Sequence, residues 1–134
     1  MADILIAEDN SAVRMAYRML LISVGHTVTD AVDGKDAITK LGAGSFDLII
    51  TDLWMPEVDG FGVIAEAKRL HPETPVLALT GGALSANALG AGEMDPATRA
   101  LGAGADMVIE KPFLGHALLS PINKLLDGAR AKSA

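Results

Sequence analysis

The fold of this chain is decided by residues 48–52, which read Leu48-Ile49-Ile50-Thr51-Asp52. A short, unbroken run of apolar and β-branched residues predicts a strand that is buried on both faces. Similar runs occur at residues 4–7, 27–29, 76–79 and 107–109. Parallel strands with both faces buried need helices on each side, so we predict an α/β fold with a doubly wound, five-stranded parallel sheet.

Helices are predicted in the intervals between these runs. Helical spacing of apolar residues places them at residues 11–24, 36–41 and 61–70, with a last helix somewhere within 114–130. Pro121 falls inside the last interval. Because proline lacks a backbone donor and clashes with the preceding turn, we expect a kink or a late start at Ser120-Pro121.

The composition fits one compact domain. The 134 residues are 50% hydrophobic, with a mean hydropathy of +0.34, which excludes disorder. The net charge of -6 argues against nucleic acid as a partner, and no apolar run approaches the roughly 18 residues of a membrane span. With no cysteine there is no disulfide and no thiolate nucleophile. We expect a single cytoplasmic domain over residues 1–134, with its core at about 3–128, a polar tail at 129–134 and no room for a DNA-binding output domain.

Polar residues stand where the predicted strands end. In a doubly wound sheet, ligands bind beyond the carboxyl ends of the strands. The residues at those ends are Glu8, Asp9, Asp52, Thr80 and Lys111. Crowded carboxylates repel one another unless a cation lies among them, and an all-oxygen set suits Mg²⁺. An ammonium and a hydroxyl beside them suit a phosphoryl group, and a carboxylate between a metal and a lysine can itself attack phosphorus to form an aspartyl phosphate.

With these residues in this order along the chain, the sequence resembles the receiver domain of two-component response regulators, in particular the CheY-like single-domain proteins. The matching motifs are the Glu8-Asp9 pair, Asp52 followed by Met55-Pro56, Asp59-Gly60, Thr80, and Lys111-Pro112-Phe113. Each motif is weak alone, but five in this order, four of them at predicted strand ends, are specific. The resemblance implies the flavodoxin-like strand order 2-1-3-4-5. It also implies a cis peptide bond at Lys111-Pro112.

The resemblance also implies a role for each strand-end residue. Asp52 would be the phosphoacceptor, and Asp9 would be the principal Mg²⁺ carboxylate, assisted by Glu8. The backbone carbonyl of Trp54 would be a further metal ligand. Thr80 would be the switch hydroxyl, and Lys111 would neutralise the phosphoryl charge.

The partners implied are a histidine kinase or a histidine phosphotransfer protein as phosphodonor, and an unknown downstream protein. The domain would not be a conventional enzyme, although it would catalyse its own phosphorylation and dephosphorylation. One alternative is a Mg²⁺-dependent phosphohydrolase. Such enzymes usually carry a second acid two residues after the nucleophile, where this chain has Trp54, and a substrate-selecting cap. The other alternative is a pseudo-receiver that never carries phosphate.

Simpler roles exist for single residues. Asp9 could cap the following helix, Asp52 could belong to a turn, Thr80 could be an N-cap and Lys111 a solvated charge. Asp59-Gly60 is better explained as a turn than as a ligand. These simpler explanations would have to hold at all five motifs together, so we reject them as a set.

Besides Pro121 in the last predicted helix, three features depart from the usual receiver. More than half of residues 81–104 are Gly or Ala, which predicts a mobile or irregular helix with a new turn near Asp95-Pro96. Val108 stands three residues before the lysine, where many receivers have an aromatic residue. We therefore hypothesise that the signal travels through ordering of residues 81–104. The indole of Trp54 could shield the acyl phosphate or merely pack on the surface.

A stripe on the first predicted helix suggests a docking face. Met15, Met19 and Ile22 follow one another at i, i+4 and i+7, beside Arg14 and Arg18. In the family this helix meets the phosphodonor, and methionine side chains adapt well to a helical partner. The alternative is a broad helix face that packs inside the domain or in a dimer.

Overall fold

The computed structural model describes residues 2–55, 58–80, 96–110 and 115–133. Five parallel strands form one sheet in the order β2-β1-β3-β4-β5, as the sequence and its resemblance predicted. The strands are β1 (Asp3–Ala7), β2 (Thr27–Ala31), β3 (Leu48–Asp52), β4 (Val76–Thr80) and β5 (Met107–Glu110). All five runs singled out in the sequence are therefore strands.

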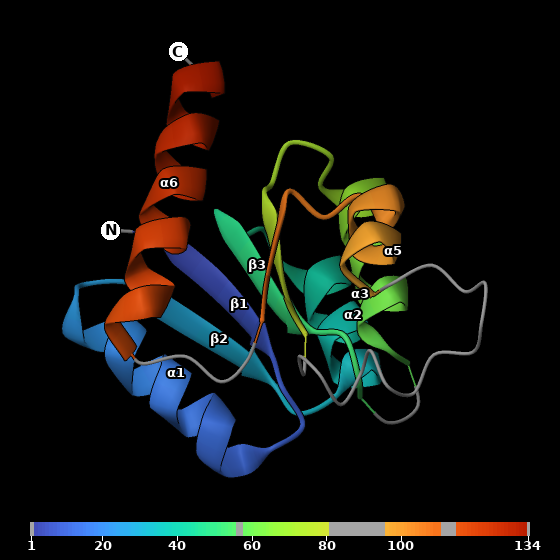
Figure 1. Cartoon of the computed structure of the whole chain (residues 1–134), viewed down its shortest axis with the longest axis horizontal. Coiled ribbons are helices and arrows are strands. Elements are labelled where there is room, and N and C mark those ends of the chain that lie inside the picture. The colour runs from blue at the N-terminus through green and yellow to red at the C-terminus, as the bar shows by residue number, and fades with distance from the viewer. Residues whose placement is uncertain (1, 56–57, 81–95, 111–114, 134) are drawn as a thin grey trace.

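Helices cover both faces of this sheet. They are α1 (Ser11–Ser23), α2 (Gly34–Ala43), α3 (Gly60–Leu70), α5 (Pro96–Ala103) and α6 (Gly115–Ser133). Figure 1 shows α1 and α6 on one side of the sheet, and α2, α3 and α5 on the other. The fold is thus the doubly wound α/β class that was predicted.

Each face of the sheet has its own hydrophobic core. Side chains alternate along a strand, so Ile4 and Ile6 of β1 pack with α1 and α6, whereas Leu5 and Ala7 pack with α2, α3 and α5. β3 lies between β1 and β4, and all of its residues are buried. Burial on both faces explains why these strands read as continuous apolar runs.

Short polar side chains begin three of the helices. Asn10, Asp33 and Asp59 each accept a hydrogen bond from a backbone N–H three residues on, which caps α1, α2 and α3 respectively. Asp59 is therefore the N-cap of α3 and Gly60 is its first residue, so these two residues begin a helix where a turn was expected. The cap of α1 is Asn10 and not Asp9, so the simpler explanation of Asp9 as a cap is wrong.

The last helix differs from its prediction. α6 begins at Gly115 and continues through Pro121, so the expected late start is wrong, whereas the alternative, a kink at Ser120-Pro121, stays a prediction. Proline removes one backbone hydrogen bond, but Leu118, Ile122 and Leu126 are buried against the sheet and hold the helix through that position. The helix also continues to Ser133, into the expected polar tail.

The glycine-rich region is described only in part. Residues 81–95 lie outside the described residues, so the expected mobility there stays a prediction. Residues 96–103 form the regular helix α5, which begins at Pro96 close to the expected turn. The Lys111-Pro112 bond also lies outside the described residues. In the described parts of the chain, no helix has both the length and the apolar character needed to cross a bilayer.

Candidate functional site

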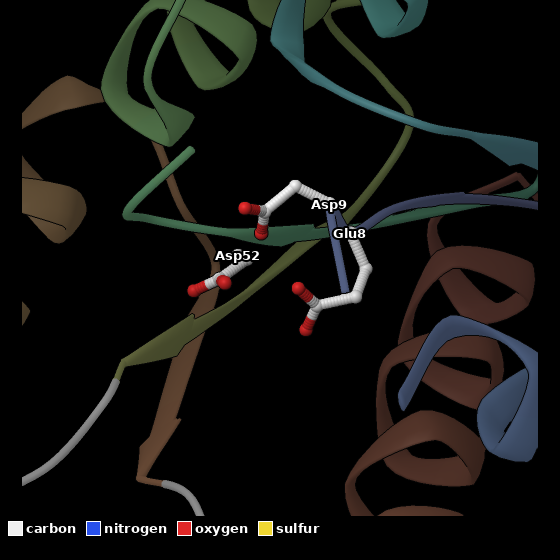
Figure 2. Close-up of side chains that lie close together, drawn as sticks. All are labelled: Glu8, Asp9 and Asp52. Carbon is white, nitrogen blue, oxygen red and sulfur yellow. The ribbon is translucent and has the colours of Figure 1, made fainter. Parts of the chain in front are cut away.

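Three predicted acids meet at the carboxyl edge of the sheet. Glu8 and Asp9 directly follow β1, and Asp52 is the last residue of β3, the neighbouring strand. Each offers a carboxylate oxygen, and these oxygens all lie within 4.8 Å of one another. In Figure 2 the three carboxylate groups face a common space. Parallel strand pairing between β1 and β3 is what brings the two segments together.

Backbone hydrogen bonds hold the turn that carries Glu8 and Asp9. The N–H of Glu8 donates to the carbonyl of Ala31 at 3.2 Å, which extends the pairing of β1 with β2 by one step. The N–H of Asn10 donates to Oε2 of Glu8 at 3.3 Å. Glu8 is 1% exposed and Asp9 is exposed, so the pair presents one inner and one outer carboxylate.

The acid at the end of β3 is buried beside the start of α3. Asp52 is 7% exposed, and its Oδ1 accepts a hydrogen bond from the N–H of Trp54 at 3.4 Å. The N–H of Gly60 donates to the carbonyl of Leu53 at 2.8 Å, which ties α3 to the loop. A Cβ on Gly60 would lie only 2.2 Å from the backbone oxygen of Asp52. Only glycine permits this close approach.

This donor set fits Mg²⁺. Three anionic oxygens at such short range repel one another, and a bound cation removes that repulsion. The cluster contains no sulfur and no imidazole, and hard divalent cations prefer oxygen ligands. The exposed Asp9 leaves room for the water ligands that Mg²⁺ usually keeps.

The indole of Trp54 contacts α3. It is 39% exposed and meets Phe61 edge to face, with the ring centroids 5.6 Å apart. The guanidinium of Arg99, from α5, lies over the same phenylalanine ring at 4.0 Å from its centroid. The indole of Trp54 therefore packs on α3, while its shielding of an acyl phosphate and the role of its backbone carbonyl as a metal ligand stay predictions.

The other two predicted residues lie at the ends of β4 and β5. Thr80 is the last residue of β4 and is 4% exposed; Asp52 pairs with the residue before it, Leu79. Thr80 itself pairs with Glu110, the last residue of β5. Lys111 follows directly in the sequence but lies outside the described residues. The structure thus brings Glu8, Asp9 and Asp52 together and places Thr80 at the same edge, whereas the contribution of Lys111 stays a prediction.

Two features of α1 bear on the site. Met15, Met19 and Ile22 are 53%, 64% and 48% exposed, so the alternative in which they pack inside the domain is wrong.

Arg14 was expected beside this stripe, but its side chain is only 15% exposed, and its Nη1 donates to the carbonyl of Glu8 at 2.8 Å. The sequence did hold one indication of this contact: Arg14 lies in the first turn of the predicted helix, shortly after the acidic residues Glu8 and Asp9.

Comparisons with known proteins agree with this architecture. The model of the response regulator receiver domain family matches residues 4–123. The transcriptional regulatory protein TcrA of Mycobacterium tuberculosis is 34% identical over 111 residues, which cover 82% of this chain and 40% of that protein. The response regulator MprA of Mycolicibacterium vanbaalenii is 31% identical, with 98% of this chain and 55% of that protein covered.

A solved structure shows the same fold over the whole length. The CheY-like response regulator receiver domain protein of Methanospirillum hungatei JF-1 is 26% identical and has a TM-score of 0.87, with 98% of both chains covered. By contrast, the chain spans about half or less of the two curated relatives above. This chain belongs to the response regulator receiver domain family, the receiver domains of two-component signalling.

Proposed function

We propose that this receiver domain takes a phosphoryl group from a phosphohistidine onto Asp52, with Mg²⁺ as cofactor. The observation that carries the proposal is the convergence of three carboxylates within 4.8 Å at the carboxyl edge of the sheet. One of them, Asp52, ends a fully buried central strand, which fixes its position. A rigid carboxylate beside a cation site suits nucleophilic attack on phosphorus.

Glu8, Asp9 and Asp52 would hold the metal through their carboxylates, and Trp54 through its backbone carbonyl. Mg²⁺ bound there would neutralise charge on the transferring phosphoryl group. The protein's own part is to keep the acids in place: backbone hydrogen bonds fix the Glu8 turn, and the Trp54 N–H orients the carboxylate of Asp52.

The transfer forms one bond and breaks one bond. An Asp52 oxygen bonds to phosphorus, while the bond from phosphorus to the donor's imidazole nitrogen breaks and its electron pair stays on that nitrogen. Thr80 would donate its hydroxyl to the phosphoryl group, and Lys111 would neutralise a phosphoryl oxygen. Attack by water on the same phosphorus would later return Asp52 to a carboxylate. The domain would thus catalyse its own phosphorylation and dephosphorylation.

The phosphodonor would be a histidine kinase or a histidine phosphotransfer protein, met in the cytoplasm. The exposed stripe of Met15, Met19 and Ile22 supports this proposal, because adaptable apolar side chains at helical spacing suit a partner made of helices. The stripe belongs to α1, whose N-terminus directly follows the acidic turn. A partner docked there would lie next to the phosphoacceptor.

The output would be a contact with a downstream protein, or onward transfer of the phosphoryl group. Val108, half-buried in β5, lacks the ring that many receivers turn on phosphorylation. A signal that travels through residues 81–104 remains our hypothesis. Hydrogen exchange across this segment with and without a phosphoryl mimic tests it, and unchanged exchange would remove it.

Intact-mass measurement after incubation with acetyl phosphate and Mg²⁺ tests the central proposal. The wild-type chain is expected to gain the mass of one phosphoryl group, and Asp52→Asn is expected to gain none. A wild-type chain that stays unmodified would favour the pseudo-receiver instead. Sustained release of phosphate from free phosphomonoesters would favour the phosphohydrolase.

A further inference from the structure

Arg14 links the acidic turn after β1 to the neighbouring strand β2. Its Nη1 donates to the backbone carbonyl of Glu8 at 2.8 Å, and its Nε donates to Oδ2 of Asp30 at 3.2 Å. The side chain is 15% exposed, although α1 lies on the surface of the domain. Two nitrogens of one planar guanidinium therefore hold two different partners, which a flexible lysine could not reproduce.

The carbonyl that Arg14 holds belongs to the peptide unit that joins Glu8 to Asp9. Because a peptide unit is planar, the direction of this carbonyl also fixes the N–H of Asp9 and thus where the Asp9 side chain begins. Within the described ranges, no group donates a hydrogen bond to the carboxylate of Asp9, which is exposed. The position of that carboxylate therefore depends on the backbone of the turn.

Asp30 in turn orients Arg14. Its Oδ1 accepts a hydrogen bond from Nη1 of Arg18 at 2.7 Å, so one carboxylate joins two arginines of α1. Arg18 is 38% exposed, and among the described residues its ion pair is with Asp30. The two arginines thus share an anchor, but Arg14 also holds the turn.

We propose that Arg14 is a positioning residue for the Mg²⁺ site: it fixes the Glu8–Asp9 turn so that both carboxylates face Asp52. This inference rests on the proposed function, since it concerns the same cation. Charge and geometry make opposite contributions. The positive charge of Arg14 repels a cation, whereas its hydrogen bond pre-organises two of the cation's ligands. Groups that orient metal ligands commonly change affinity by about 10–100-fold, so we expect the geometric contribution to be the larger one.

Calorimetric titration of the metal-free protein with Mg²⁺ tests the proposal on Arg14→Lys, Arg14→Met and the matched control Arg18→Lys. If Arg14 positions the turn, both Arg14 variants lose about tenfold or more in Mg²⁺ affinity, because neither lysine nor methionine can hold both partners. Arg18→Lys keeps the wild-type affinity. Thermal unfolding without Mg²⁺ shows whether each variant is folded.

Three results would overturn the proposal. Tighter Mg²⁺ binding by Arg14→Met, with Arg14→Lys unchanged, would show that Arg14 acts through charge alone. Unchanged affinity in both variants would show that its contact with the turn is irrelevant. Equal weakening in Arg18→Lys would indicate a general effect on the packing of α1.

A second variant serves if the Arg14 substitutions fail to fold. Asp30→Asn leaves Arg14 in place but removes the charge that orients it, so a smaller loss of Mg²⁺ affinity is expected, and unchanged affinity would count against the proposal. A wild-type chain that binds no Mg²⁺ would instead overturn the proposed function. The two failures are therefore distinguishable.

Discussion

Replacing Gly60 by alanine tests how closely the start of α3 packs against the end of β3, the strand that ends at Asp52. The new Cβ would lie 2.2 Å from the backbone oxygen of Asp52 and 2.5 Å from the Cα of Leu53. Ordinary contact begins near 3.4 Å, so the start of α3 must move by about 1.2 Å relative to the end of β3. The obstruction is backbone and cannot rotate away. Overpacking of this kind lowers the free energy of unfolding by about 1–3 kcal/mol. The shift would also strain the hydrogen bond from the N–H of residue 60 to the carbonyl of Leu53, which lowers it by about 1 kcal/mol more.

Gly62→Ala is the matched control, two residues along the same helix. Its Cβ would meet Cγ1 of Val58 at 2.8 Å, and this is the end of a side chain that can shift. Alanine also favours a helix over glycine by about 1 kcal/mol, which offsets that contact. The same gain applies to Gly60, so urea unfolding should place Gly60→Ala about 1–3 kcal/mol below wild type and Gly62→Ala close to it. Equal stability of the two variants would refute this account of the close approach.

Three further predictions concern other parts of the molecule. Trp54→Ala removes the edge-to-face contact with Phe61 and should lower the free energy of unfolding by about 0.5–1.5 kcal/mol. The rate of dephosphorylation should stay unchanged, and a faster rate would assign the indole a shielding role. The backbone N–H of Val32 holds the pKa of Asp36 below its ordinary value of 3.8, so Asp36 stabilises the fold above that pH. The stability difference between wild type and Asp36→Asn should therefore shrink as the pH falls below about 4, and a constant difference in urea titrations would contradict this assignment. Met19→Ser should slow phosphotransfer from a phosphohistidine protein without slowing phosphorylation by acetyl phosphate; slowing of both would locate the effect in the site and not in docking.

The strands and the acidic cluster were predictable because each follows from local chemistry. Residues such as Ile49 and Ile50 are buried whichever face they point to, so the run itself predicts a strand. Once the strands are parallel, the acids that end them must share one edge. The extent of α6 was not predictable in this way. Proline at position 121 opposes a helix locally, but burial of Leu118 and Ile122 outweighs it, and that burial depends on tertiary packing.

Arg14 shows a second limit of sequence reasoning. The sequence correctly predicts that Arg14 is next to Met15 in the helix α1, but it does not predict the direction of the Arg14 side chain. Which way a long side chain turns depends on its partners, here the Glu8 carbonyl and Asp30. Neither partner could be matched to Arg14 before the pairing of β1 with β2 and the seating of α1 were known.

The two faces of α1 can be tested separately, because the proposals give each face a different role. Its inner side holds the acidic turn through Arg14, while Met15, Met19 and Ile22 leave the outer side apolar and exposed. A substitution on the inner side should change the affinity of the domain for Mg²⁺, whichever phosphodonor is used. A substitution on the outer side should matter only for a donor large enough to dock. Phosphorylation by a small donor such as acetyl phosphate therefore depends on the site alone. The ratio of the phosphorylation rate with a phosphohistidine protein to the rate with acetyl phosphate then measures the contribution of the exposed face of α1 to docking.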